Sequence, residues 1–277
     1  MNKNIVFLLS AIILSGPLSA QKKPALEKRW ETDSVFKVPE SVLYDKSAKV
    51  LYVANIDGPS GEKDGKGSIG KLGTDGKVIA VDWVSGLEAP KGMAKYKNRL
   101  WVADLDHMVV IDIDAAKILR RIKIDGAVFL NDVTVDNQGT VYVSDSRTKK
   151  VHKIEEDQPS VHLEDLQGPN GLLFHNGSLY VLDNGNLYRV EKDKKLHKLA
   201  GGMESSTDGI EHVKGNEFIV SCWSGVVYYV HGDGTTTILL DTRATKTNSA
   251  DIGYDATRKI VYVPTFFGNT VAAYQLK

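Results

Sequence analysis

Six short segments of this chain share one pattern and recur at a nearly constant spacing. Each has a large apolar residue, then an aromatic residue or Ile, then Val. Their second residues are Tyr52, Trp101, Tyr142, Tyr180, Ile219 and Tyr262, which lie 38 to 49 residues apart. A period near 40 built from short β-rich runs is typical of a ring of four-stranded blades. The sequence therefore predicts an all-β fold, a six-bladed β-propeller, with a pair of β-sandwiches as the alternative.

Strand and turn signals divide each repeat into four strands. In the fourth repeat we expect strands at 171–175, 178–184, 186–191 and 195–199. The last repeat has three, at 252–255, 259–266 and 270–276, so the ring needs a fourth strand from the N-terminal side. We expect residues 35–38 to be that closing strand, because closure removes two exposed sheet edges. The prediction is one propeller domain over 35–277, preceded by an extension over 21–34.

The N-terminus has the layout of a secretory signal peptide over residues 1–20. A short basic start is followed by an apolar run over 5–14, then by Pro17 and the small pair Ser19-Ala20. About ten apolar residues are too few to span a bilayer core of ~30 Å. We therefore expect an exported protein, periplasmic or secreted, that does not span the membrane.

Charge and cysteine content exclude several classes of function. Lys plus Arg equals Asp plus Glu at 35 each, so no strong field favours nucleic acid. The single cysteine, Cys222, rules out an intrachain disulfide and a multi-cysteine zinc site. The segment 65–71 imitates a phosphate-binding loop, but Leu72 replaces the Ser or Thr that holds magnesium. We interpret it as part of a hairpin loop over 58–70, and we expect a monomer that acts on a small molecule.

The register of the repeats predicts a ring of side chains at one mouth of the central channel. Just before each innermost strand stand Glu40, Lys91, Asn131, Asn170, Asp208 and Ala250. Two carboxylates and two carboxamides among these six suit a hard divalent cation such as calcium, magnesium or manganese. The alternative is that Asn170-Gly171 and Asp208-Gly209 are ordinary turn dipeptides.

The chain resembles the family of gluconolactonases, senescence marker protein (regucalcin) and luciferin-regenerating enzyme over about residues 35–277. The resemblance rests on Pro39-Glu40, Leu130-Asn131-Asp132, and the segments 168–172 and 207–210. It implies one divalent cation, most simply Ca²⁺ with Mg²⁺, Mn²⁺ or Zn²⁺ as alternatives. Glu40, Asn170 and Asp208 would hold it, and Asn131 matches a position that contacts either the metal or the substrate.

One departure from that family bears on the substrate. Many sugar-lactone members carry Arg two residues before the third-blade Asn, where this chain has Phe129. Phe129 removes a hydrogen-bond donor and adds apolar surface, so we expect hydrophilic substrates to be disfavoured.

Two functions are consistent with these features. The first is a metal-dependent hydrolase of cyclic esters, a lactonase, with Asp208 as general base and Asn131, Phe129 and Lys91 contacting substrate. The second is a non-catalytic exported propeller that binds a small ligand or a protein partner through the same mouth.

Overall fold

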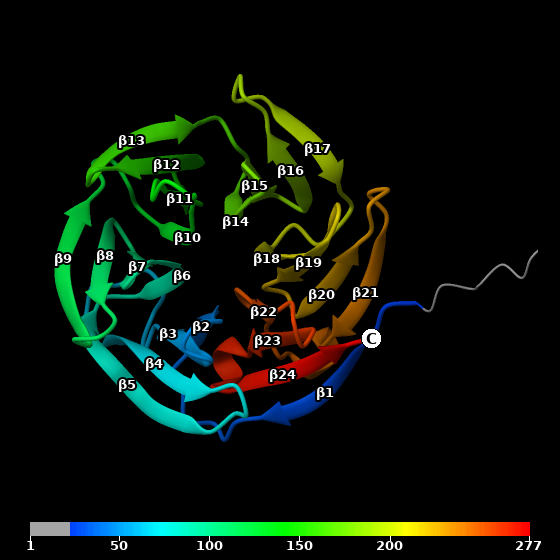
Figure 1. The fold of residues 1–277 in the computed structure, drawn as a ribbon, viewed down its shortest axis with the longest axis horizontal. Helices are drawn as coiled ribbons and strands as arrows, with labels where there is room; N and C mark the ends of the chain where they lie inside the picture. The colour runs from blue at the N-terminus through cyan, green and yellow to red at the C-terminus, as the bar shows by residue number, and fades with distance from the viewer. Residues whose placement is uncertain (1–22) are drawn as a thin grey trace, which may run out of the picture.

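The protein, described here by a computed structural model over residues 23–277, is built almost entirely of β-strands. These residues form twenty-four strands in six four-stranded antiparallel sheets. The sheets are blades around a central axis, with the innermost strand of each blade facing that axis (Figure 1). The predicted all-β, six-bladed architecture is confirmed. The expected signal peptide, residues 1–20, lies outside the described residues.

The strands of the first five blades follow one another along the chain. Blade 1 consists of β2 (Pro39–Asp45), β3 (Val50–Asn55), β4 (Gly67–Gly73) and β5 (Val78–Leu87). Blade 2 consists of β6 (Pro90–Tyr96), β7 (Arg99–Asp104), β8 (His107–Asp112) and β9 (Lys117–Lys123). Blade 3 consists of β10 (Leu130–Val135), β11 (Val141–Asp145), β12 (Lys150–Glu155) and β13 (Gln158–Leu163).

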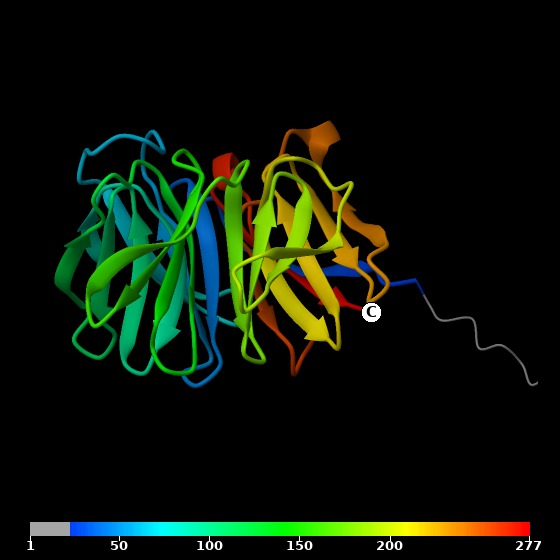
Figure 2. The same cartoon turned by 90° about the horizontal axis from the view of Figure 1, so that it is seen from above.

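The remaining blades complete the ring. Blade 4 consists of β14 (Pro169–His175), β15 (Ser178–Asp183), β16 (Asn186–Val190) and β17 (Leu196–Ala200). Blade 5 consists of β18 (Thr207–Lys214), β19 (Glu217–Cys222), β20 (Val226–Val230) and β21 (Thr236–Asp241). Blade 6 consists of β22 (Gly253–Asp255), β23 (Ile260–Pro264), β24 (Val271–Leu276) and β1 (Leu26–Glu31). Two short 3₁₀ helices, η1 (Arg243–Thr245) and η2 (Phe266–Gly268), stand at one face of the ring (Figure 2).

The ring is closed by an N-terminal strand, but not by the segment that we predicted. The closing strand is β1, which pairs antiparallel with β24 from Leu26↔Leu276 to Glu31↔Ala272. The expectation for residues 35–38 is wrong because Phe36 is buried between blades 6 and 1, where it fills a core position instead of joining a ladder. Since β1 is outermost and mostly exposed, its sequence has no apolar alternation that could reveal it.

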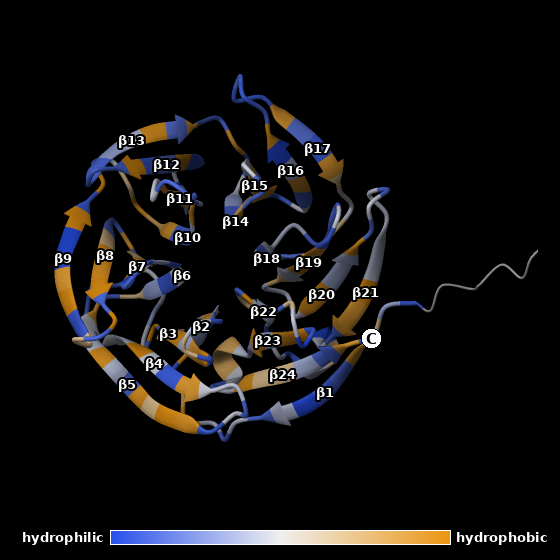
Figure 3. Cartoon of the chain, viewed as in Figure 1, coloured by the Kyte–Doolittle hydropathy of each residue, from blue (hydrophilic) through white to orange (hydrophobic). Residues whose placement is uncertain are grey.

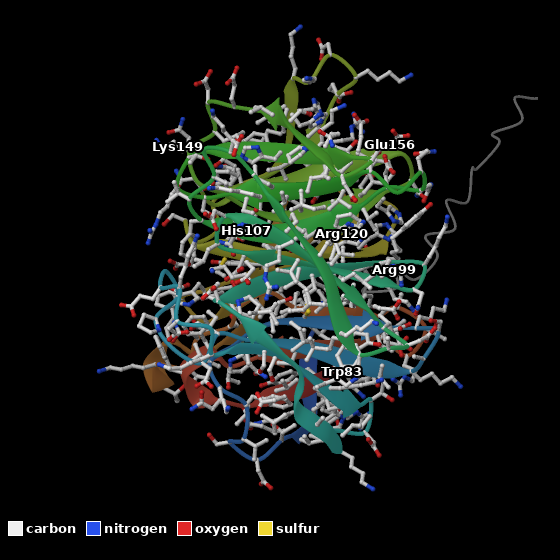
Figure 4. The ribbon with its side chains drawn as sticks, turned by 90° about the vertical axis from the view of Figure 1, so that its left-hand side faces the viewer. Trp83, Arg99, His107, Arg120, Lys149 and Glu156 are labelled. Carbon is white, nitrogen blue, oxygen red and sulfur yellow. The ribbon has the colours of Figure 1, made fainter. Side chains whose placement is uncertain are left out.

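The core lies between the blades. Six apolar clusters each join one blade to the next around the ring. Outer strands such as β9 and β17 mix apolar and polar residues without strict alternation (Figure 3), and most of their residues are exposed or half-buried. Charged side chains including Arg120, Lys149 and Glu156 project from outer strands and turns (Figure 4). Among residues 23–277, no helix is long and apolar enough to cross a membrane.

Candidate metal and substrate site

Five of the six predicted ring residues line a single pocket of about 390 Å³ at one mouth of the channel. They are Glu40, Lys91, Asn131, Asn170 and Asp208. The sixth, Ala250, is fully buried and contributes no polar side chain; its carbonyl accepts a hydrogen bond from Ser221 Oγ at 2.7 Å. The pocket opens on the face that carries η2, since Phe266 and Phe267 also line it.

An irregularity in the ladder lies at each of these five positions. In every blade from 1 to 5, the pairing of the first two strands shifts register at the ring residue, for example between Pro169 and Leu172 and between Thr207 and Ile210. Such bulges disrupt the ladder locally and change the direction in which a side chain points from the sheet. Here they place the ring residues at the start of the innermost strands, where their side chains reach the pocket.

A buried aspartate anchors the chain just before three of the ring residues. Asp104, Asp145 and Asp183 each end a second strand and accept backbone N–H groups from the segment that enters the innermost strand. Gly168 N, for instance, donates to Asp183 Oδ1 at 2.6 Å, two residues before Asn170. In blades 2, 3 and 4, the aspartate that ends the second strand therefore fixes the segment that leads into the ring residue.

The turn interpretation of the two glycine dipeptides is wrong. Asn170-Gly171 lies in β14 and Asp208-Gly209 lies in β18, and neither glycine has the positive φ of a tight turn. Gly171 is needed because a Cβ there would overlap the carbonyl oxygen of Asp208 on the neighbouring blade. The dipeptides thus combine a side chain that faces the pocket with a residue small enough for the blades to meet.

The oxygen donors of the pocket include atoms that are buried without a partner. Glu40 Oε2 and Asn170 Oδ1 lack any hydrogen bond. The Asn170 amide nitrogen donates to Asp208 Oδ1 at 3.1 Å, and that of Asn131 donates to Ser146 Oγ at 3.0 Å. Because buried acceptors are normally satisfied, an occupant that offers positive charge fits this set.

The electrostatics of the pocket also favour a cation. Burial raises the pKa of Glu40 well above its usual value, and the charges of Asp208 and Asp251 add to this while Lys91 opposes it. Burial and Asp251 likewise raise the pKa of Asp208, which the Asn170 hydrogen bond partly counters. Within residues 23–277, no group of three or more His, Cys, Asp or Glu side chains is arranged to hold a metal ion. The pocket instead offers two carboxylates, of Glu40 and Asp208, and two carboxamides, of Asn131 and Asn170.

Lys91 and Phe129 meet on the blade 2 and 3 side of the pocket. Lys91 Nζ donates to Ala89 O at 2.9 Å and lies 4.3 Å from the centroid of the Phe129 ring. Burial lowers the pKa of Lys91 to about 8, against the opposing charge of Glu40. The Arg147 guanidinium lies 4.5 Å from the same ring. Phe129 thus lines the pocket beside two cationic groups. The Phe129 side chain cannot donate a hydrogen bond, but the Arg147 guanidinium next to it can.

Sequence reasoning missed two parts of this region. One is an aromatic wall that we define as Trp223, Phe266 and Phe267, which lines the pocket on the blade 5 and 6 side. The other is a second layer of carboxylates deeper in the channel: Asp132, Glu211 and Asp251, around a cavity of about 280 Å³. Asp132 and Asp251 each follow a ring position directly, so reading the register one residue further would have found them. No repeat pattern marks the wall.

The second layer is held by short hydrogen bonds. Asp132 accepts the backbone N–H groups of Val133 and Leu172, both at 2.6 Å, and Asp251 accepts Ser41 Oγ at 2.6 Å. Burial raises the pKa of all three carboxyls, that of Asp251 to about 7. The axis of the propeller therefore carries four buried carboxyl groups, Glu40, Asp208, Asp132 and Asp251, and the half-buried Glu211, at two depths.

No protein-family model matches this chain, and no curated protein matches it. Many solved structures are similar. One is described as a putative gluconolactonase, with 14% identity, a TM-score of 0.69 and coverage of 92% of both chains. A luciferin-regenerating enzyme shows 13% identity and a TM-score of 0.64, covering 92% of this chain and 95% of its own. A streptogramin B lyase shows 10% identity and a TM-score of 0.66, covering 92% and 98%. This chain therefore has the propeller fold that a putative gluconolactonase, a luciferin-regenerating enzyme and a streptogramin B lyase share.

Proposed function

We propose that this protein is an exported hydrolase of cyclic esters, a lactonase, that depends on one divalent cation held by Glu40, Asn170, Asp208 and Asn131. The observation that carries the proposal is the pair of unpartnered buried oxygens, Glu40 Oε2 and Asn170 Oδ1, in one pocket with the Asp208 carboxylate. Calcium is the cation that this oxygen set suits best, with Mg²⁺, Mn²⁺ or Zn²⁺ as alternatives. When bound, the ion supplies Lewis-acid polarisation of the ester carbonyl and activation of water.

Asp208 is the residue suited to move the proton. One of its oxygens, Oδ1, accepts the Asn170 amide, which leaves Oδ2 to accept a proton from the attacking water. The water oxygen bonds to the carbonyl carbon, the ring C–O bond breaks, and Asp208 returns the proton to the departing ring oxygen to give a hydroxy acid. Asn131, fixed by Ser146, and Lys91, whose ammonium carries hydrogens beyond the one given to Ala89, would orient the carbonyl.

The test replaces Asp208 with Asn, which keeps size and hydrogen-bond geometry but removes charge and basicity. We expect calcium affinity in calorimetry to fall at least about tenfold, and hydrolysis of a panel of lactones to fall by a factor of roughly 10² to 10⁴. Thermal unfolding of the cation-free protein should not worsen, since a buried like-charge interaction with Glu40 is lost. Unchanged calcium affinity would reject the site.

Asp233→Asn is the matched control. Asp233-Gly234 is another Asp-Gly dipeptide, but it forms an exposed turn in which Asp233 Oδ1 accepts Thr235 N at 3.0 Å and Gly234 has a φ of 84°. Asn is equally suited to such a turn. This variant should match wild type in calcium affinity, turnover and melting temperature.

The second candidate function is ligand binding without turnover, and the observation in its favour is Lys91. An ammonium group in the ring already offsets part of the negative charge of Glu40, so the pocket has an internal cation. If calorimetry shows that this protein binds lactones, and no tested divalent ion gives turnover, the result would support this candidate over hydrolysis.

Export is the part of the proposal that rests on sequence alone. The basic start, apolar run and small residues before Gln21 support it. Mass spectrometry of protein from the producing cells should show a mature chain that begins near Gln21, and retention of Met1 would contradict it.

A further inference from the structure

The rim of the pocket gathers exposed aromatic side chains. Phe267 is 65% exposed and Trp223 is 41% exposed, and no other aromatic residue is among the exposed large hydrophobic residues of the described chain. Both line the pocket that contains Asp208. With Phe266 they form a contiguous group, with ring centroids 4.7 to 6.3 Å apart in edge-on arrangements. Exposed apolar surface grouped at a pocket is characteristic of a binding surface.

The aromatic wall is held firmly in place. Trp223 N donates to Ser206 O, and Asn248 Nδ2 donates to Trp223 O, both at 2.8 Å. Phe266 is buried in a cluster with Ile56 and Ala250. Its φ of 48° is an unfavourable left-handed conformation for an aromatic residue. Surrounding contacts hold Phe266 in this conformation, which presents Phe267 at the mouth, and such strain is characteristic of binding sites.

The aromatic wall adjoins the one ring position that has no polar side chain. Ala250 is the one ring position without a polar side chain, and Phe266 packs beside it. Trp223 follows Cys222, which pairs with Thr207, so the wall adjoins the strand that carries Asp208. Phe129 packs against the same apolar cluster as Phe266, whereas Lys91 belongs to β6 of blade 2, which lies across the central axis from blade 5 (Figure 1). A molecule whose reacting group lies at Asp208 would therefore place a substituent that points toward blades 5 and 6 against the aromatic wall.

We propose that Trp223, Phe266 and Phe267 form a specificity subsite for an alkyl or aryl substituent, so that the preferred substrates are lactones with an apolar side chain. The part of this inference that concerns hydrolysis rests on the proposed function. The binding of the substituent by the aromatic wall does not depend on it. Each methylene group that the wall partly covers should improve affinity about twofold, which is roughly half of what full burial provides. A hexyl substituent should therefore raise kcat/KM about 50-fold over the unsubstituted ring.

The experiment compares wild type, Phe267→Ser and Ile238→Ser. Phe267 is so exposed that its loss should not impair folding. Ile238 is a matched control because it is 50% exposed on β21 and does not line the pocket. Two readouts are used: kcat/KM for δ-valerolactone and for its hexyl-substituted form, and direct binding of a hexyl-substituted cyclic ether, which cannot be hydrolysed, followed by tryptophan fluorescence.

Wild type and Ile238→Ser should prefer the hexyl compound, and Phe267→Ser should lose about five- to tenfold of that preference, measured as the ratio of kcat/KM for the hexyl compound to kcat/KM for the unsubstituted lactone. If no form hydrolyses any lactone but the hexyl ether binds wild type more tightly than Phe267→Ser, the hydrolase function fails and the subsite stands. If lactones are hydrolysed without regard to the substituent, or if the hexyl ether does not bind, the subsite is refuted.

Discussion

Replacement of Asp251 by Asn should make the cation-free protein more stable at neutral pH, by an amount that grows as pH rises from about 4 to about 7 and is then constant. Asp251 is buried and its pKa is raised to about 7, mainly by burial, with its hydrogen bonds from Ser41 and Ile252 acting the other way. The carboxyls of Asp132, Glu211 and Asp208 have raised pKa values to which Asp251 contributes. Asn keeps the shape and an acceptor oxygen but carries no charge.

The sign and size follow from linkage between protonation and folding. A carboxyl whose pKa is higher in the folded state contributes its full stability below the unfolded value near 3.8, and that stability is lost as pH rises through 7. A difference of about three pKa units corresponds to about 4 kcal/mol. The free energy of unfolding of Asp251→Asn, relative to wild type, should therefore rise by about 4 kcal/mol between pH 4 and pH 8.

Urea unfolding in chelator, followed by tryptophan fluorescence at intervals from pH 4 to pH 8, measures this difference. Asp255→Asn is a control of opposite sign, because the ion pair with Arg258 and nearby N–H groups outweigh burial and lower the pKa of Asp255. That variant should lose stability relative to wild type as pH rises through the lowered folded-state pKa toward 3.8, so its series extends down to pH 2, and its difference from wild type should be constant from pH 5 to pH 8. A stability difference for Asp251→Asn that stays constant with pH would refute the reasoning.

Two further predictions concern the framework of the site. Gly171→Ala should cost about 2 to 4 kcal/mol in urea unfolding and weaken calcium binding, because the new methyl group overlaps Asp208 O; Gly232→Ala, whose methyl group meets only atoms 4.0 Å away, should cost no more than about 1 kcal/mol. Trp30→Ala should lower stability by about 2 to 4 kcal/mol, because Trp30 packs on Tyr262 at 5.9 Å and donates to Thr74 O. An unchanged urea midpoint in Trp30→Ala would show that β1 does not hold the ring closed.

The repeat alone determined the number of blades and the ring of candidate ligands. Each buried second strand, such as the one around Tyr52 or Tyr262, must bury both faces between blades, so its apolar pattern is strong in the sequence. Once these strands are placed, counting back 10 to 12 residues from the second residue of each repeated segment gives the residue at the channel mouth. The grouping of Glu40, Asn170 and Asp208 in one pocket follows from this counting.

Only the tertiary structure decided the features that the repeat does not encode. The closing strand at Leu26–Glu31 is outermost and solvated, so neither face imposes an apolar pattern that would distinguish it from a loop. Arg147 reaches Phe129 from the turn after β11, and Trp223 meets Phe267 from a different blade. The first contact joins two loops of blade 3, and the second joins blade 5 to blade 6. They depend on where loops end in space, a property that no local pattern of residue types carries.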